Sequence, residues 1–511
     1  MSSAVDNRGK LMWASFLTLI AAGMGFGVRA GVLSEWADAF GFTKFELGTI
    51  TGGGLVGFGI VILIASLITD RIGYKKILLI AFLLHVISLV LTLAATPIFH
   101  AMGKDATFQC LYWGMFIFAV ANGLCEGVIN PLIANIYPEN RTHYLNILHA
   151  GWPGGLILGG LLGLGLVGKV PWEIPTALYI LPSLWYGFIV IKEPFPDSDV
   201  KKTGITFAQM LGEFASPILL CLLLLHACVG YVELGTDSWI TSITEMLTKQ
   251  GFLLFIYASS IMFVLRFFAG PIVERINPLG LLCISSVLGA TGLFLLGSVK
   301  TALMAWIAVT IYGFGKTFLW PTMLGIVGER FPRGGAITMG AMGGIGMLSA
   351  GLLGGPGIGY KQDRFASENL QATAMETYDR YKANSENGFL FFPKVTGLDG
   401  QKVGVLREDP PATTLESDYA TFKERQEKGE GEIPAELVAL KQWWDTTGEP
   451  NQETDKQPVE EASIQGGRMA LKITAAVPAT MFVGYLLLVI YFRMQGGYKT
   501  VELTEQSESK E

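Results

Sequence analysis

The chain reads Ser66-Leu67-Ile68-Thr69-Asp70-Arg71-Ile72-Gly73-Tyr74-Lys75-Lys76 at the junction of two apolar runs, 47–69 and 77–98. About 20 consecutive apolar residues are long enough to cross a bilayer as a helix. Two such runs separated by a few charged residues predict a helical hairpin that spans the membrane twice, with the charged turn in water.

Ten further apolar runs have a similar length. They lie at 11–33, 110–136, 144–168, 175–192, 214–235, 251–273, 278–299, 302–328, 335–357 and 470–492. The chain of 511 residues is 51% hydrophobic and only 16% charged, which is typical of a membrane protein. The first run follows Arg8 and Lys10, but it is too long for the apolar core of a signal peptide, and we interpret it as an uncleaved helix. The sequence therefore predicts an all-α membrane protein with twelve transmembrane helices.

Lysine and arginine are distributed unevenly over the loops. With the N-terminus inside, the cytoplasmic segments hold Arg8, Lys10, Arg71, Lys75, Lys76, Arg141, Lys192, Lys201, Lys202, Arg275, Arg330, Arg333, Arg493, Lys499 and Lys510. The short outer loops hold only Lys44, Lys104, Lys169, Lys249 and Lys300. Because basic residues concentrate in cytoplasmic loops, we expect a multi-pass protein of a bacterial inner (plasma) membrane with both termini cytoplasmic.

The spans divide the chain into two groups of six. We expect an N-terminal six-helix half at 1-192, a cytoplasmic central loop at 193-213, helices seven to eleven at 214-357, an extracytoplasmic insertion at 358-469, helix twelve at 470-492 and a cytoplasmic tail at 493-511. The insertion contains helix-like charged runs at 418–428 and 435–445, and an apolar patch at 389–392 that is placed to dock on the outer helix ends. We interpret it as a partly ordered extracytoplasmic cap without a site of its own.

Two patterns recur in the two halves. Asp70-Arg71-Ile72 follows the second span, and Glu274-Arg275-Ile276 follows the eighth, each four residues after a small residue. The second pattern is Pro131, Glu139 and Arg141 before a glycine-rich run at 151–163, matched by Pro321, Glu329 and Arg330 before 340–355. These repeats predict two pseudo-symmetric halves, as in transporters whose site lies at the repeat interface.

The segment from Asp70 to Lys76 resembles the signature loop between helices two and three of the major facilitator superfamily. The family usually has glycine at the place of Ser66 and a basic residue at the place of Tyr74. The resemblance covers the helical part of the chain and implies the two-half, twelve-helix fold of that family. It also implies a cytoplasmic gate formed by Asp70, Arg71, Gly73 and Lys75, with Glu274 and Arg275 as counterparts. The basic residues among them would also satisfy the positive-inside rule.

A narrower resemblance points to one branch of that family. Residues Glu126-Gly127-Val128-Ile129-Asn130-Pro131, Arg141-Thr142-His143-Tyr144-Leu145-Asn146, Glu233 and Arg266-Phe267-Phe268-Ala269-Gly270 resemble the fucose/galactose/glucose–proton symporters. This implies proton-coupled sugar transport. That branch has an acid on helix one, where this chain has Arg29.

Ionisable residues within the spans are sorted by helix. Arg29, Glu126, Glu233 and Lys316 lie in helices one, four, seven and ten, which line the central cavity in the family that the chain resembles. A charge at mid-bilayer costs roughly 2.5–3.5 kcal/mol on insertion scales, so it is retained where it is paired or faces water. We therefore predict a substrate and proton pathway formed by Arg29, Asn122, Glu126, Asn130, His149, Glu233, Arg266, Lys316 and Trp320.

Several of these residues have a second interpretation. Arg29 either lines the cavity or extends to the outer interface, and Arg266 is either a site residue or a structural bridge. His149 and His226 are proton relays or packed core histidines. Glu126 is the candidate proton carrier, and its protonation would release it from Arg29 or Lys316.

The sequence thus predicts a secondary active transporter that moves a small polar, sugar-like organic solute by alternating access, coupled to H⁺. A transporter of organic anions or carboxylates with the same fold is the first alternative, because Arg29 and Lys316 lie on cavity helices. A non-transporting receptor that uses the insertion is the second. We expect a monomer in the lipid bilayer without enzyme activity, cofactor, metal site or nucleic-acid partner, because the sequence has no nucleophile–base set, metal-ligand cluster or basic surface.

Overall fold

The computed structural model describes residues 7–40, 42, 47, 50, 54–428 and 432–503, without the side chains of residues 29–31, 34, 37, 38 and 425. The N-terminal half contains α1 (Arg8–Phe40), α3 (Gly54–Ile72), α4 (Tyr74–Leu93), α5 (Ala95–Met102), α6 (Lys104–Ile136), η1 (Pro138–Asn140), α7 (Arg141–Leu166), α8 (Glu173–Ala177) and α9 (Ile180–Lys192). A connection follows with α10 (Asp199–Lys202), α11 (Phe207–Gly212) and η2 (Glu213–Ala215).

The C-terminal half is built from interrupted helices. They are α12 (Pro217–Gly230), η3 (Tyr231–Gly235), α13 (Thr236–Thr248), α14 (Gly251–Arg266), α15 (Ala269–Leu296), α16 (Ala302–Lys316), α17 (Leu319–Arg330), η4 (Pro332–Gly334), α18 (Gly335–Ser349), η5 (Ala350–Gly354), the start of α19 (Gly355–Thr373), the end of α24 (Glu449–Thr474) and α25 (Ala476–Met494). In α15, Asn277 has φ 58° and ψ 166°, and the helix kinks there. This kink falls between the spans predicted at 251–273 and 278–299.

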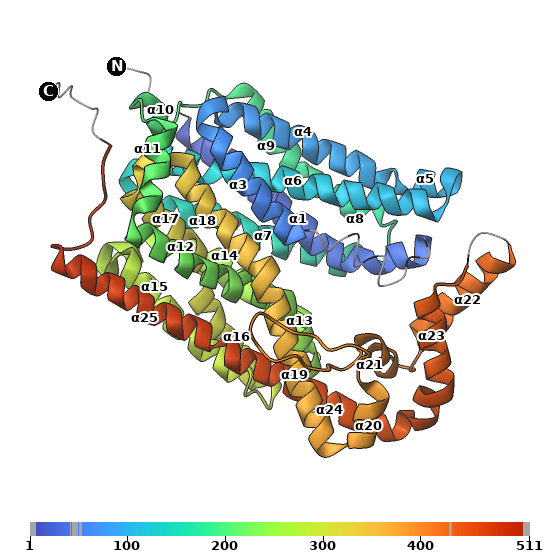
Figure 1. The fold of residues 1–511 in the computed structure, drawn as a ribbon. Coiled ribbons are helices and arrows are strands. Elements are labelled where there is room, and N and C mark those ends of the chain that lie inside the picture. Colours follow the sequence, from blue (N-terminus) through green and yellow to red (C-terminus); the bar gives the residue numbers. More distant parts are fainter. Residues whose placement is uncertain are drawn as a thin grey trace.

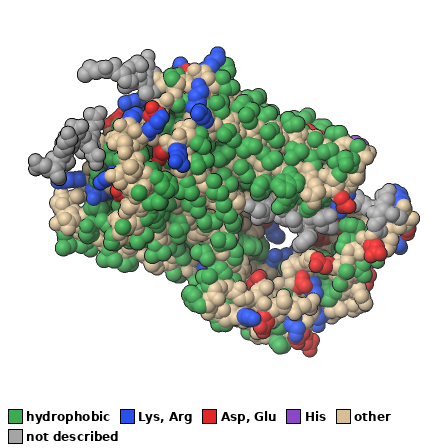
Figure 2. Space-filling model, turned by 45° about the horizontal axis from the view of Figure 1, so that its top comes forward, with side chains coloured by type: hydrophobic (Ala, Val, Ile, Leu, Met, Phe, Trp, Pro, Cys, Tyr) green, Lys and Arg blue, Asp and Glu red, His purple; other side chains and the backbone are tan. Residues whose placement is uncertain are grey.

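Eleven helical segments of the described residues are long and apolar enough to cross a membrane, and Gly251–Arg266 is a shorter apolar helix between them. The predicted all-α fold of twelve transmembrane helices is confirmed. Large apolar side chains such as Trp185, Leu224, Leu303 and Leu487 are exposed on the outside of the bundle. Figure 2 shows hydrophobic side chains covering the flank of the bundle, with charged side chains gathered at its ends. Such a surface suits contact with lipid rather than water.

The beginning of α1 and the end of α25 lie at one end of the bundle, which we call the terminal end. Residues 358–469 (the insertion) lie at the other, the insertion end (Figure 1). Glycines allow helices of the two halves to come close. A Cβ on Gly340 of α18 would lie 2.1 Å from the Cβ of Ser66 on α3, and one on Gly154 of α7 would lie 2.9 Å from the Phe263 ring on α14. Close approach through small residues is the usual way in which membrane helices associate.

Ser66 and Gly73 both have clear structural roles at the terminal end. Ser66 stands where the resembled family usually has glycine, and here the glycine of the contact, Gly340, lies on the opposite helix. Gly73 has φ 93° and joins α3 directly to α4. Since this backbone region favours glycine, the tight turn accounts for Gly73 without any further role.

Two helices contain a widened π-helical turn at the same depth. The turn η3 lies between α12 and α13, and η5 lies between α18 and α19. They contact each other through glycines, because a Cβ on Gly235 would lie 2.6 Å from the Cα of Gly354. Such turns are frequent at functional sites because they redirect side chains. Here one of them carries Glu233.

The insertion is a folded unit that grows out of two membrane helices. It contains the rest of α19, α20 (Met375–Tyr381), α21 (Gly400–Arg407), α22 (Thr413–Glu427), α23 (Ala435–Trp443), η6 (Trp444–Gly448) and most of α24. Its own buried core includes Leu370, Tyr381, Leu406, Trp444 and Val459. The helix-like runs predicted at 418–428 and 435–445 coincide with α22 and α23.

The insertion contacts both halves. Phe389 lies against α19, where a Cβ on Gly357 would be 2.8 Å from its ring, so the predicted docking of the apolar patch is confirmed for this residue. On the other side, the Lys104 ammonium at the start of α6 lies 4.6 Å from the centroid of the Phe422 ring on α22. The insertion therefore extends from the C-terminal half across to the N-terminal half, and Figure 2 shows a hollow beneath it.

Candidate functional site

A chain of hydrogen bonds connects helices α6 and α7 in the middle of the N-terminal half. The Nδ2 group of Asn130 donates to Oε2 of Glu126 at 2.8 Å, and Oδ1 of Asn130 lies 2.8 Å from Nε2 of His149. All three side chains are at most 5% exposed. Four-residue spacing places Glu126 and Asn130 on one face of α6, which brings their side chains into contact.

Arg266 connects this chain to the C-terminal half. Its Nη1 donates to the backbone oxygen of His149 at 2.6 Å, its Nε donates to the backbone oxygen of Thr317 at 2.8 Å, and its Nη2 pairs with Oε1 of Glu233 at 3.0 Å. Arg266 is 1% exposed and Glu233 is 4% exposed. The guanidinium thus links α14 to three other segments, namely α7 of the N-terminal half, η3 and the turn between α16 and α17, which its fixed fork of donors permits.

A second buried ion pair lies within the C-terminal half. The Lys316 ammonium pairs with Oδ1 of Asp237 at 2.6 Å, and the side chains are 1% and 15% exposed. Asp237 follows Glu233 by four residues across the end of η3, so both acids face the same side. Lys316 is therefore paired with Asp237 and not with Glu126, which we expected protonation to release from Arg29 or Lys316.

The remaining predicted pathway residues lie in three different surroundings. The centroids of the Trp320 and His226 rings lie 4.6 Å apart. A Cβ on Gly346 of α18 would lie 2.6 Å from the Trp320 ring. Asn122 turns toward α4, where its Oδ1 lies 3.0 Å from Nε2 of His85. Arg29 belongs to α1, but its side chain lies outside the described residues.

Several buried polar atoms near these pairs lack a partner among the described residues. They are Oε2 of Glu233, Nδ2 of Asn122 and both ring nitrogens of His226. Buried polar groups in folded proteins are nearly always hydrogen-bonded to protein or water. Only the Glu233 oxygen belongs to an ion pair, whereas Asn122 lies against His85 and His226 against Trp320.

The two halves are also joined at the terminal end. Thr142 donates through its hydroxyl to Oε1 of Glu329 at 2.5 Å, and Arg141 donates to the backbone oxygen of Gly328 at 2.8 Å. Asp70 accepts from the backbone N–H of Ala336 at 3.0 Å, at the start of α18. A carboxylate at a helix N-terminus is favourable because the free N–H groups carry partial positive charge.

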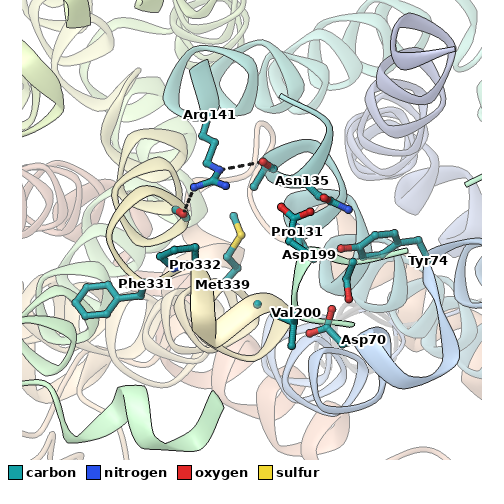
Figure 3. Close-up of a pocket in the computed structure, with 14 residues that line it drawn as sticks. Asp70, Tyr74, Pro131, Asn135, Arg141, Asp199, Val200, Phe331, Pro332 and Met339 are labelled. Atoms are coloured by element: carbon teal, nitrogen blue, oxygen red, sulfur yellow. Dashed lines mark hydrogen bonds between the residues drawn. The ribbon is translucent and has the colours of Figure 1, made fainter. Parts of the chain in front are cut away.

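The chain end reinforces these contacts. The Tyr498 hydroxyl donates to Oε2 of Glu329 at 2.6 Å, and the N–H of Val501 donates to the Glu329 backbone oxygen at 2.8 Å. Around this junction lies a cavity of about 380 Å³, including its open part, that is lined by residues of both halves. Figure 3 shows Asp70, Tyr74, Asp199 and Arg141 around it, with Arg141 hydrogen-bonded between the halves.

The other predicted gate residues are placed differently. Lys75 donates to the backbone oxygens of Ile191 and Glu193, both at 3.0 Å, and so binds within its own half. Arg71, Glu274 and Arg275 are exposed, and among the described residues none of them has a hydrogen bond or ion pair. Of the predicted set, Asp70 alone forms a hydrogen bond between the halves within the described part of the chain.

The sequence model of the Major Facilitator Superfamily matches residues 15–355. The chain belongs to the major facilitator superfamily. The fucose–proton symporter of Escherichia coli in an outward conformation superposes with a TM-score of 0.57 at 17% identity, covering 71% of this chain and 93% of the symporter. At that identity the likeness shows the fold alone. The predicted family is confirmed, and the chain is a multi-pass membrane protein of a transporter family.

Two curated relatives are named for different compounds. A gallate transporter of Pseudomonas putida is 26% identical over 202 residues, which are 36% of this chain and 41% of the transporter. A class E tetracycline resistance protein of Escherichia coli is 22% identical over 294 residues, covering 54% of this chain and 68% of that protein. The chain thus spans less than half the length of the gallate transporter that it matches.

For this major facilitator protein, sequence reasoning missed Asp237 in one ion pair, and Glu329 and Arg141 in the contact at the terminal end. Asp237 was overlooked because the apolar run ends at residue 235, whereas the helix continues to Thr248. The four-residue spacing from Glu233 was the signal that could have identified it. Glu329 and Arg141 belonged to the repeated pattern of Pro131 and Pro321, although that pattern did not indicate that they meet.

We expect Asp237→Asn to lower the free energy of unfolding by about 3–5 kcal/mol, because it leaves Lys316 buried without an anion. Denaturant or thermal unfolding of the purified protein measures this. The double variant Asp237→Asn/Lys316→Met should regain most of the loss. The exposed pair of Lys202 and Asp199 provides the control, since Lys202→Met should cost about 1 kcal/mol or less. Equal effects of D237N and K202M would contradict this account.

Proposed function

We propose that this major facilitator protein is a secondary active transporter that moves a small polar, sugar-like organic solute across the inner membrane by alternating access. The observation that carries the proposal is the buried polar chain Glu126–Asn130–His149–Arg266–Glu233, which crosses the interface between the halves. Charges are retained in a membrane interior where they pair or face water, and there they mark substrate or ion pathways. We propose that the terminal end is cytoplasmic and that the protein acts as a monomer.

Alternating access requires contacts that can form and break between the halves. The bond from Arg266 to the His149 backbone oxygen is such a contact at the level of the ion pairs. At the terminal end, the bonds of Thr142 and Arg141 to α17 would have to open before a solute could leave there. The structure therefore corresponds to a state that is closed at the terminal end.

We propose H⁺ as the coupling ion and Glu126 as its carrier. Glu126 is 5% exposed and has an amide rather than a cation as its hydrogen-bond partner. A carboxyl without a paired cation in a buried site can exist in its neutral form at moderate energetic cost. Glu233, in contrast, is paired with Arg266 and is better suited to hold that cation in place.

We expect Glu126→Gln to retain solute counterflow but to lose accumulation driven by a pH gradient. With one coupled proton, wild-type protein can accumulate solute up to about tenfold per pH unit, and the variant should reach only the external concentration. The measurement is uptake of a radiolabelled sugar into proteoliposomes with and without a pH gradient. Glu139→Gln is the matched control, because this exposed carboxylate lies just beyond the C-terminal end of α6, the helix that carries Glu126. If E126Q still accumulated solute, another group would carry the proton.

The second candidate is a transporter of organic anions or carboxylates. The partial likeness to a gallate transporter favours it. Against it, Arg266 and Lys316 are each already paired with a carboxylate, so neither cation is available to a substrate anion in this state. Inhibition of sugar counterflow by benzoate, and loss of that inhibition in Lys316→Met, would favour the anion transporter. Saturable flux of either solute would exclude a receptor that does not transport.

A further inference from the structure

A large open cavity lies at the insertion end, away from the polar chain at mid-depth. It measures about 1200 Å³, including the part that is open to solvent. Its walls come from α13, the start of α19 and the loop at 387–389 of the insertion. The side chains that give it chemical character are Trp239, Tyr360, Gln362, Asp363, Asn387 and Phe389. The cavity is thus a joint product of the membrane helices and the insertion.

Its aromatic walls are held in fixed positions. The indole N–H of Trp239 donates to the backbone oxygen of Gly355 at 2.8 Å, and a Cβ on Gly359 would lie 3.1 Å from the ring. The Tyr360 hydroxyl donates to the backbone oxygen of Pro393 at 2.7 Å. The rings of Tyr360 and Phe389 lie 6.0 Å apart. Rigid aromatic faces of this kind bind apolar surfaces at low entropic cost.

Two polar groups of the cavity lining lack partners among the described residues. Within the described residues, the Asp363 carboxylate has neither a hydrogen-bond donor nor a cation as a partner. The Nε2 group of Gln362 is buried and also lacks a partner there. Asn387 is positioned by its backbone, which exchanges two hydrogen bonds with Val395 at 2.8 and 2.9 Å. Unpaired donors and acceptors in a concave, aromatic-lined cavity are the usual features of a small-molecule site.

We propose that this cavity is a second binding site, for a neutral polyhydroxylated solute, located on the route to the mid-depth chain. A ring or chain of CH groups would stack on Trp239 while its hydroxyl groups donate to Asp363 and accept from Gln362. An organic anion would meet the Asp363 carboxylate. A quaternary ammonium ion suits aromatic rings and a carboxylate, but it offers no acceptor to the unpaired Gln362 donor.

The position of the cavity connects it to the proposed pathway. Trp239 lies four residues beyond the π-helical turn that carries Glu233, and Gly355 directly follows the facing turn η5. A solute in the cavity therefore touches the helix that contains η3, which carries Glu233, and the helix that contains the facing turn η5. The inference deepens the proposed function, on which its ligand class rests, by adding a site where the solute is captured first.

Binding to the purified full-length protein tests the proposal. The probes are D-glucose, D-xylose and L-fucose, with benzoate and choline as the anionic and cationic comparisons, followed by calorimetry and by tryptophan fluorescence. We expect at least one sugar to bind, and Asp363→Asn to weaken its binding at least tenfold, as expected for the loss of hydrogen bonds to a charged group. Trp239→Ala should weaken it similarly. Asp379→Asn, at an exposed carboxylate of the insertion, should leave it unchanged.

Each outcome is decisive, because binding and flux are measured separately. If no sugar binds, if D363N and W239A both leave binding unchanged, or if benzoate or choline binds more tightly than every sugar, the proposed site is wrong. Sugar binding that depends on Asp363 supports it even when the sugar is not transported, a result that would contradict the proposed function alone. Sugar flux with binding that is insensitive to both substitutions would contradict the second site and leave the transporter proposal intact.

Discussion

Arg266→Met is expected to abolish counterflow and to lower the free energy of unfolding by about 3–5 kcal/mol. Arg266 is fully enclosed and donates to three partners on three other segments, namely Glu233, the His149 backbone and the Thr317 backbone. Its removal leaves the Glu233 carboxylate buried without a cation and leaves two backbone acceptors unpaired. An uncompensated buried charge is among the costliest single defects in a protein.

A second substitution separates the structural role of Arg266 from its role in transport. In Arg266→Met/Glu233→Gln the buried charge is gone, so most of the stability should return, whereas counterflow should stay at background if the ion pair serves the pathway. Unfolding in detergent and counterflow in proteoliposomes give the two readouts. Wild-type flux in the double variant would show that the pair is only a structural bridge, the alternative that the sequence left open.

Gly325→Ala is expected to shift the protein toward a state that is open at the terminal end. A Cβ on Gly325 would lie 2.4 Å from the Thr142 hydroxyl oxygen and 2.8 Å from the Thr142 Cα, on the opposite half. Overpacking of this kind costs about 1–3 kcal/mol. Because the overlap exists only while the halves touch, it changes the ratio of closed to open states by about 5- to 150-fold.

Spin labels measure this shift. Cysteines replacing Arg71 and Glu274, which are exposed on opposite halves, can be labelled in a background without the five native cysteines. The distance distribution between the labels should gain a longer component in G325A. Gly328→Ala, one turn further along α17, is the control, since its Cβ would lie 3.6 Å from the nearest atom, the Cβ of Ala134. An unchanged distribution in G325A would show that the glycine is not needed for closure.

Hydropathy was sufficient for the number and order of the membrane helices, because a bilayer imposes a minimum length on each apolar run. It could not show where a helix ends when its last turns leave the apolar region. Helix seven illustrates this, since it continues through a π-helical turn to Thr248 and places Asp237 against Lys316. The spacing from Glu233 was visible in the sequence, whereas the extension of the helix beyond the apolar run was not.

Pairing between distant segments was also beyond the sequence. Glu126 and Lys316 were identified as buried charges, yet each has a partner on its own half, Asn130 and Asp237 respectively. At the terminal end the resemblance to the family indicated Asp70, whereas the contacts of Glu329 with Thr142 and Tyr498 depend on how the halves and the tail come together. The polar composition of the insertion suggested only partial order. Composition did not indicate the small buried core around Tyr381 and Trp444.

Because α24 continues into helix twelve, the insertion should move together with the C-terminal half. The 26 residues of α24 correspond to about 39 Å of helix at 1.5 Å per residue. If the C-terminal half rotates by about 10°, a point at that distance moves by about 7 Å, far more than any atom near the pivot. Because α22 contacts Lys104 at the start of α6, this motion changes the position of α22 relative to the N-terminal half. The distance between a pair of dyes on α22 and α5 would therefore report the conformational cycle, without altering the residues of the transport pathway.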